Sequence, residues 1–164
     1  NAIDGLTKLT IFLSYILAIS VFKDIWRVFQ YHGAEHKSIW TYENGLPLTV
    51  ANARKQTRYH PRCGTSFIFI VILMSILVYT VVPPAETFVG QLALRLAVIP
   101  LIAGISYELL KLSAKFQKSA IMKVFLMPGL MIQRLTTKEP EDAQLEVALN
   151  SLSESLKLEG DLVV

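Results

Sequence analysis

The residues best suited to metal chemistry lie in one short part of this 164-residue chain. All three histidines and the only cysteine fall between positions 32 and 63, as two pairs, His32 with His36 and His60 with Cys63. On a helix His32 and His36 are one turn apart, so both imidazoles project from one face and can bind one ion. Two residues separate His60 from Cys63, a spacing common in local ligand pairs. The four side chains are therefore predicted to share one metal ion.

Glu35 and the first histidine pair together form a motif that is known from zinc enzymes. The run His32-x-x-Glu35-His36 matches the H-x-x-E-H pattern of the inverted zinc peptidases, in which the histidines hold zinc and the glutamate is the general base. Nothing else in the chain suggests the soluble fold of those peptidases. Glu35 is our predicted catalytic base, although an ion pair with Arg58 or Arg62, or direct ligation, would also explain it. Histidine and cysteine favour zinc, or another divalent transition metal, over magnesium.

Two further carboxylates could join the site. Glu108 ends the third apolar segment, where an ionisable group is a functional candidate, but an ion pair with Lys111 would also explain it. Glu43 lies in a turn and is more typical of an exposed acid than of a ligand. The histidines could also be surface residues at a membrane interface, and Cys63 a small buried residue. Their clustering favours the metal site.

The elements that must position these side chains are apolar helices. The composition is 52% hydrophobic and 18% charged, against about 25% charged in soluble domains. Cys63 to Ala85 contains no charged residue, and a helix spans a bilayer with roughly 20 apolar residues. We predict an all-α integral membrane protein with about three transmembrane helices, near residues 6–28, 64–83 and 87–110. One cysteine excludes a disulfide framework.

The remaining segments differ from these spans. Residues 119–135 are apolar but broken by Lys123, Pro128 and Gly129, which predicts an interfacial or re-entrant segment closing a membrane domain of residues 1–138. Residues 139–164 form an acidic tail, in which leucines recur at helical spacing and predict an amphipathic helix. Because residue 1 is Asn, we expect the chain to be part of a longer protein.

Charge predicts how the spans are oriented. Seven basic residues lie at or within the segment joining the first two spans: Lys23, Arg27, Lys37, Arg54, Lys55, Arg58 and Arg62. Lys111, Lys115 and Lys118 follow the third span, whereas the connection between the second and third spans has no Lys or Arg. The positive-inside rule therefore places residues 23–63, which carry the predicted metal ligands, and the C-terminal tail in the cytoplasm. These bases flank membrane helices, so we expect a lipid bilayer and no nucleic acid as partner.

Four segments together resemble a known family. They are residues 31–37 (Tyr-His-Gly-Ala-Glu-His-Lys), 60–67 (His-Pro-Arg-Cys-Gly-Thr-Ser-Phe), 104–108 (Gly-Ile-Ser-Tyr-Glu), and Pro128-Gly129-Leu130 with Gln133 to Thr137. The chain resembles the YqhQ-like bacterial family, the domain of unknown function 1385, over nearly its whole length. The resemblance implies a multi-pass protein of the bacterial cytoplasmic membrane, a predicted metal-dependent enzyme, with an N-terminal region before the first span.

Three functions follow as hypotheses. The first is a zinc hydrolase at the cytoplasmic membrane face: His32, His36 and either His60 or Cys63 hold the ion, and Glu35 takes a proton from bound water. Its substrate would be a lipid headgroup or a membrane-near peptide. The second is a scaffold or membrane-protein biogenesis factor whose four ligands form a closed, structural site. The third is a transporter subunit, suggested by Arg95 and Pro100, which would require a homo-oligomer.

The orientation is testable by cysteine labelling in intact cells. We expect a cysteine placed in the 44–50 turn to stay unlabelled by an impermeant reagent until the membrane is opened, because this segment lies on the basic side. Rapid labelling of that turn from outside would refute the orientation.

Overall fold

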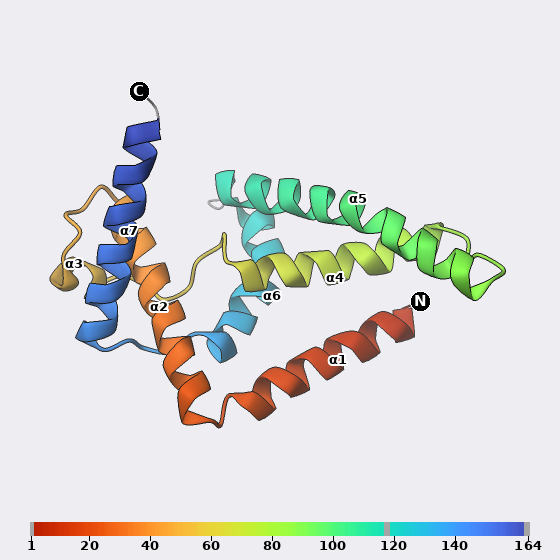
Figure 1. The fold of residues 1–164 in the computed structure, drawn as a ribbon, viewed down its shortest axis with the longest axis horizontal. Helices are drawn as coiled ribbons and strands as arrows, with labels where there is room; N and C mark the ends of the chain where they lie inside the picture. Colours follow the sequence, from red (N-terminus) through yellow and green to blue (C-terminus); the bar gives the residue numbers. More distant parts are fainter. Residues whose placement is uncertain (1, 117–118, 163–164) are drawn as a thin grey trace. The chain divides into compact units, whose positions relative to one another are not determined.

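Every regular element of the part of the chain described, residues 2–116 and 119–162, is a helix in the computed structural model. The expected all-α class is confirmed. Lys118 lies outside the described residues. The helices, shown in Figure 1, are α1 (Ala2–Ile19), α2 (Lys23–Glu43), α3 (Val50–Arg54), α4 (Gly64–Val81), α5 (Phe88–Lys115), α6 (Ala120–Thr136) and α7 (Asp142–Leu162).

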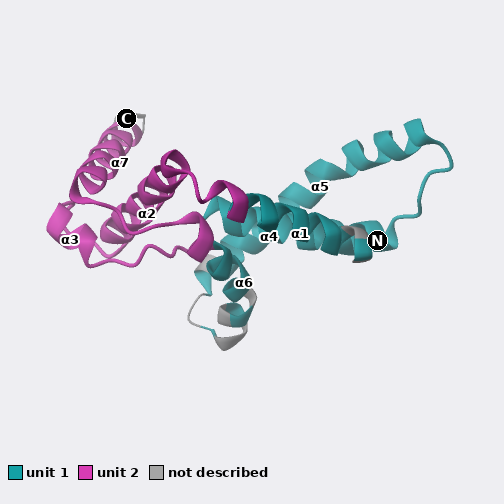
Figure 2. Cartoon of the chain, turned by 90° about the horizontal axis from the view of Figure 1, so that it is seen from below, with its two compact units in different colours: residues 1–16, 61–132 teal, residues 17–60, 133–164 magenta. Residues whose placement is uncertain are grey.

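The chain divides into two compact units, coloured in Figure 2. Unit 1 comprises residues 1–16 and 61–132, and unit 2 comprises residues 17–60 and 133–164. Unit 1 contains α4 and α5, and unit 2 contains α2, α3 and α7. The proposed division into a membrane part, 1–138, and a tail, 139–164, concerns the bilayer, and it stays a prediction.

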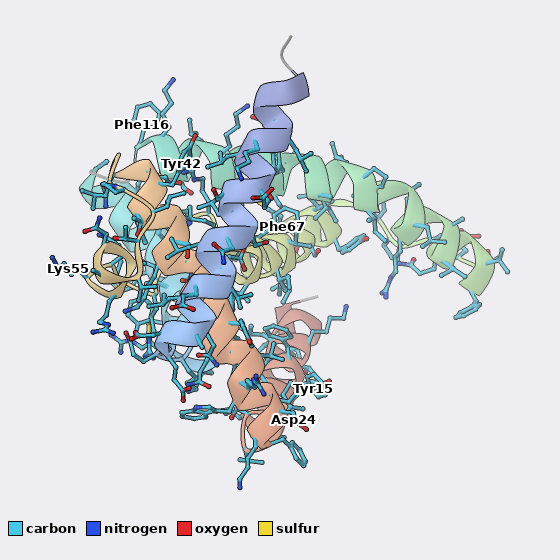
Figure 3. All side chains as sticks on the ribbon, turned by 60° about the vertical axis from the view of Figure 1, so that its left-hand side comes forward. Tyr15, Asp24, Tyr42, Lys55, Phe67 and Phe116 are labelled. Carbon is cyan, nitrogen blue, oxygen red and sulfur yellow. The ribbon has the colours of Figure 1, made fainter. Side chains whose placement is uncertain are left out.

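Helices α4 and α5 of unit 1 have the length and composition of membrane spans. The segments Gly64–Val81 of α4 and Phe88–Ser113 of α5 have mean hydropathies of 2.3 and 1.9, and only 11% and 6% of their residues are buried. Exposed apolar surface on this scale is compatible with contact with lipid tails rather than water. Tyr15 of α1, 61% exposed, likewise stands out from its helix (Figure 3).

The first expected span, 6–28, is not one continuous helix. Helix α1 ends at Ile19 and α2 begins at Lys23, and the two helices are bent by 106° at this break. The Ser20 hydroxyl donates to the carbonyl of Leu17, and Phe22 is extended with φ −78° and ψ 134°. The two helices are long and apolar enough for a membrane span only when they are taken together, so the described residues contain two candidate spans, or three if this bent pair is one.

Helix α6 occupies the segment expected to be interfacial or re-entrant. Pro128 lies inside it. A Cβ added to Gly129 would lie 2.7 Å from the Ser66 hydroxyl oxygen, so the α6 backbone approaches the start of α4 closely. The depth of this helix in a membrane stays a prediction.

Unit 2 has a small core between α2, α3 and α7. Ala34, Ala53, Leu145 and Leu149 are all at most 5% exposed and pack together. The helix expected in the acidic tail is therefore present as α7, and Figure 1 shows it beside α2. Its apolar leucine face is buried against α2 and α3.

Two ion pairs hold the same elements together. The buried Lys37 ammonium bonds to the Arg54 carbonyl at 3.1 Å and pairs with Glu139. Arg54 itself pairs with Asp142 at the start of α7, and the hydrogen bond and charge of Asp142 raise the pKa of the Arg54 guanidinium. A lysine that is 3% exposed needs such partners, because an unpaired buried charge is costly.

Gly33 permits a close backbone approach in this unit. The Lys138 amide donates to the Phe29 carbonyl at 2.8 Å, and a Cβ on Gly33 would lie 2.2 Å from the Lys138 carbonyl oxygen. No flexible side-chain end is available to move aside. The residue must therefore be glycine for the chain after α6 to lie on α2.

We expect Gly33→Ala to destabilise the protein by about 1–3 kcal/mol, because the added methyl group collides with backbone. Thermal unfolding in detergent, followed by circular dichroism, measures the change. Gly160→Ala is the control, since a Cβ there meets open space within a helix. An unchanged melting temperature for Gly33→Ala would show that this approach is not rigid.

Candidate metal centre

His32 and His36 lie on one face of α2, as their spacing predicts. Their ring centroids are 4.4 Å apart in an edge-on arrangement, and His36 is 3% exposed. Helix α2 thus presents two imidazoles side by side.

Cys63 completes a group that could hold a metal. One ligand atom from each of His32, His36 and Cys63 lies within 4.8 Å of the other two. Ligand atoms around a tetrahedral zinc ion are roughly 3.5 Å apart, so modest side-chain rotation would close the difference. Cys63 is 5% exposed and caps the N-terminus of α4, accepting from the Thr65 amide at 3.4 Å. The thiolate is the form of cysteine that binds metal.

Hydrogen bonds select the nitrogen that each histidine of the pair offers. His32 Nδ1 lies 2.8 Å from the Thr136 carbonyl oxygen, and His36 Nδ1 lies 2.6 Å from the Arg58 carbonyl oxygen. A carbonyl oxygen can only accept, so both Nδ1 atoms carry the proton and both Nε2 atoms present lone pairs. Metal-binding histidines are typically oriented in this way.

His60 is held by its backbone. The buried Gln133 side chain accepts from the His60 amide at 2.8 Å and donates to the His60 carbonyl at 2.7 Å. The ring of Trp40 lies 4.9 Å from the His60 ring, and its Nε1 donates to the Tyr59 carbonyl at 2.8 Å. The sequence singled out Gln133 only as part of the family resemblance and did not single out Trp40, because neither residue type signals a role in orienting a loop.

Glu43 lies closer to the histidines than its turn position suggested. Its carboxylate oxygen is 3.4 Å from His60 Nε2, and the His60 ring is 5.8 Å from that of His36. Residue 43 is eleven positions after His32 and seven after His36, which places all three on one face of α2. This periodicity is the signal that could have singled out Glu43.

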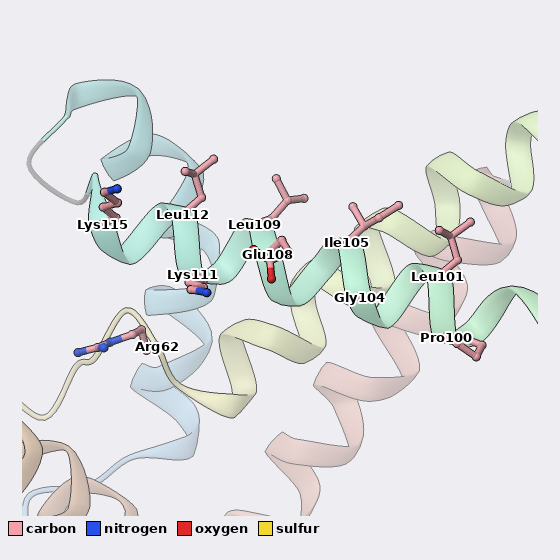
Figure 4. Close-up of a pocket in the computed structure, with 10 residues that line it drawn as sticks. All are labelled: Arg62, Pro100, Leu101, Gly104, Ile105, Glu108, Leu109, Lys111, Leu112 and Lys115. Carbon is pink, nitrogen blue, oxygen red and sulfur yellow. The ribbon is translucent and has the colours of Figure 1, made fainter. Parts of the chain in front are cut away.

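The other two predicted carboxylates lie elsewhere and do not belong to the three-residue group. Glu35 is exposed and lines a groove of about 340 Å³ between α2 and α7. Glu108 lines a larger groove along α5 (Figure 4). Within residues 2–116 and 119–162, no ion pair joins Glu108 to Lys111. The roles predicted for Glu35 and Glu108 stay predictions.

We expect Gln133→Met to destabilise the protein by about 2–4 kcal/mol, because it removes two buried hydrogen bonds, to the His60 amide and to the His60 carbonyl. Hydrogen exchange of residues 57–64 should accelerate, and the melting temperature in detergent should fall. Gln56→Met is the control, since the Gln56 side chain bonds to the Asn44 side chain and to the Asn52 carbonyl rather than to His60. Equal effects of the two substitutions would contradict a specific role for Gln133.

Comparison with known proteins places the chain in a family. The model of the family described as "Protein of unknown function (DUF1385)" matches residues 1–158. The chain is similar to the uncharacterized protein YqhQ of Bacillus subtilis (strain 168), with 48% identity over 159 residues, 97% of this chain and 50% of that protein. It thus spans half the length of this curated relative.

No solved structure matches the chain. The two descriptions name no metal and no reaction, so the expected description of the family as metal-dependent enzymes is not supported by them. The resemblance seen in the sequence motifs is otherwise confirmed. With the family model matching nearly every residue, this chain belongs to the DUF1385 family.

Proposed function

We propose that this protein holds a zinc ion at the cytoplasmic face of a bacterial cytoplasmic membrane and uses it for hydrolysis. The observation that carries the proposal is the group His32, His36 and Cys63, with ligand atoms within 4.8 Å of one another. The carbonyl-bound Nδ1 atoms of both histidines support it, because they pre-orient two ligand nitrogens.

The number of ligands favours chemistry over structure. Three protein ligands leave one tetrahedral position for water or substrate, the arrangement of catalytic zinc sites. A zinc ion held there would supply Lewis acidity and a nucleophile at neutral pH. The substrate would be a lipid headgroup or a membrane-near peptide, since the centre lies in a chain with apolar, span-length helices.

A proton carrier is also needed, and two carboxylates compete for the role. The Glu43–His60 pair at 3.4 Å can relay a proton beside the centre, because the carboxylate can stabilise a charged imidazole. Glu35 fits the H-x-x-E-H pattern but is exposed on the groove beside α7. The geometry therefore favours Glu43 with His60, and Glu35 remains the alternative.

His60 also supports a second candidate function. Its ring lies 5.8 Å from that of His36, near enough for a rotated side chain to supply a fourth ligand. A four-ligand site would be closed and would contribute to folding, as expected for a scaffold or a biogenesis factor.

Zinc content of purified variants tests the centre. We expect about one zinc per chain in the wild type and large losses in His36→Ala and Cys63→Ser, because each removes a ligand. Glu43→Gln and Glu35→Gln should both retain zinc, and only the variant lacking the true base should fail to complement a deletion strain. Full zinc in both His36→Ala and Cys63→Ser would exclude this ligand set.

Cobalt substitution separates the two candidate functions. An open site should bind an added anion such as azide and shift the visible d–d bands of the Co²⁺ protein, whereas a closed site should not respond. In His60→Ala, the spectrum should stay unchanged for the open site and change for the closed one. An azide response together with an intact His60→Ala spectrum supports the hydrolase.

A further inference from the structure

The large groove of unit 1 runs along α5 and has two chemically different ends. Its volume is about 960 Å³, enough for a hydrocarbon chain. Figure 4 shows Leu101, Ile105, Leu109 and Leu112 projecting from one side of the helix. Leu101 and Leu112 are 57% and 45% exposed, so this wall is available to an apolar ligand.

The other end of the groove is cationic. Lys111 and Lys115 lie one helical turn apart on α5, and Arg62 lies on the side to which Lys111 projects (Figure 4). The part of α5 that is apolar enough to cross a membrane ends at Ser113, so the two lysines lie where a bilayer would change from hydrocarbon to headgroups. The charged residues that line the groove are three cations and one carboxylate, Glu108, so the lining favours an anion.

We propose that this groove binds an anionic phospholipid. The acyl chain lies along the leucine and isoleucine wall, and the phosphate accepts hydrogen bonds from Lys111, Lys115 and Arg62. Glu108 is the one acceptor among the charged lining residues, so it suits a headgroup that also carries hydroxyl donors, such as glycerol. The proposal does not depend on the metal centre.

The space beside Gly104 supports an elongated ligand. A Cβ added to Gly104, which also lines the groove, meets nothing within 4 Å. A large side chain at this position would occupy the apolar part of the groove without touching the charged end. The binding of the acyl chain and the binding of the headgroup can therefore be tested separately.

Native mass spectrometry of the full chain, released from nanodiscs of dioleoylphosphatidylglycerol or dioleoylphosphatidylcholine, measures the retained lipid. We expect selective retention of phosphatidylglycerol. The double variant Lys111→Gln/Lys115→Gln should retain it about tenfold less, because each lysine near the membrane surface adds attraction for the phosphate. The control Lys55→Gln/Lys157→Gln removes the same charge from exposed lysines outside the groove and should behave as wild type.

Gly104→Leu gives the second arm. It should reduce lipid retention severalfold with the lysines intact, because the leucine side chain would occupy the space of the acyl chain. Equal retention of both lipids, loss in the control double variant, or no loss in either groove variant would overturn the proposal. Displacement of the lipid by millimolar inorganic phosphate would indicate a free phosphate site and would also overturn it.

Discussion

Three side-chain donors hold the backbone of residues 58–60, and the candidate metal centre depends on that constraint. His36 donates to the Arg58 carbonyl, Trp40 to the Tyr59 carbonyl and Gln133 to the His60 carbonyl. Buried carbonyls without partners are costly, so these bonds fix where the loop can lie. The same bonds set the tautomer of His36 and the position of His60, three residues before Cys63.

Helix α2 is held in place by contacts of a few particular residues rather than by an extended apolar face. Ala34 lies in the core with Leu145 and Leu149, and Gly33 allows the chain after α6 to approach the helix. The buried Lys37 joins the same helix to Glu139. Small residues, one ion pair and the tail helix thus hold the histidine face of α2 in one orientation, which is the requirement for a preformed metal site.

Much of this architecture follows from the sequence. Apolar length alone located α4 and α5, and leucine periodicity located α7, because burial and lipid contact impose simple spacing rules. The break before Lys23 could not be foreseen, since Ser20, Val21 and Phe22 include neither glycine nor proline. Spacing on α2 brought His32 and His36 together, whereas the Gln133 bonds join residues far apart in sequence and leave no local pattern.

Zinc-edge X-ray absorption on the purified, detergent-solubilised chain would show whether His32, His36 and Cys63 bind one ion together. We expect a four-coordinate ion with one sulfur neighbour at about 2.3 Å and two imidazole nitrogens at about 2.0 Å. A bound ion with only oxygen neighbours, or a chain that retains no transition metal, would contradict it.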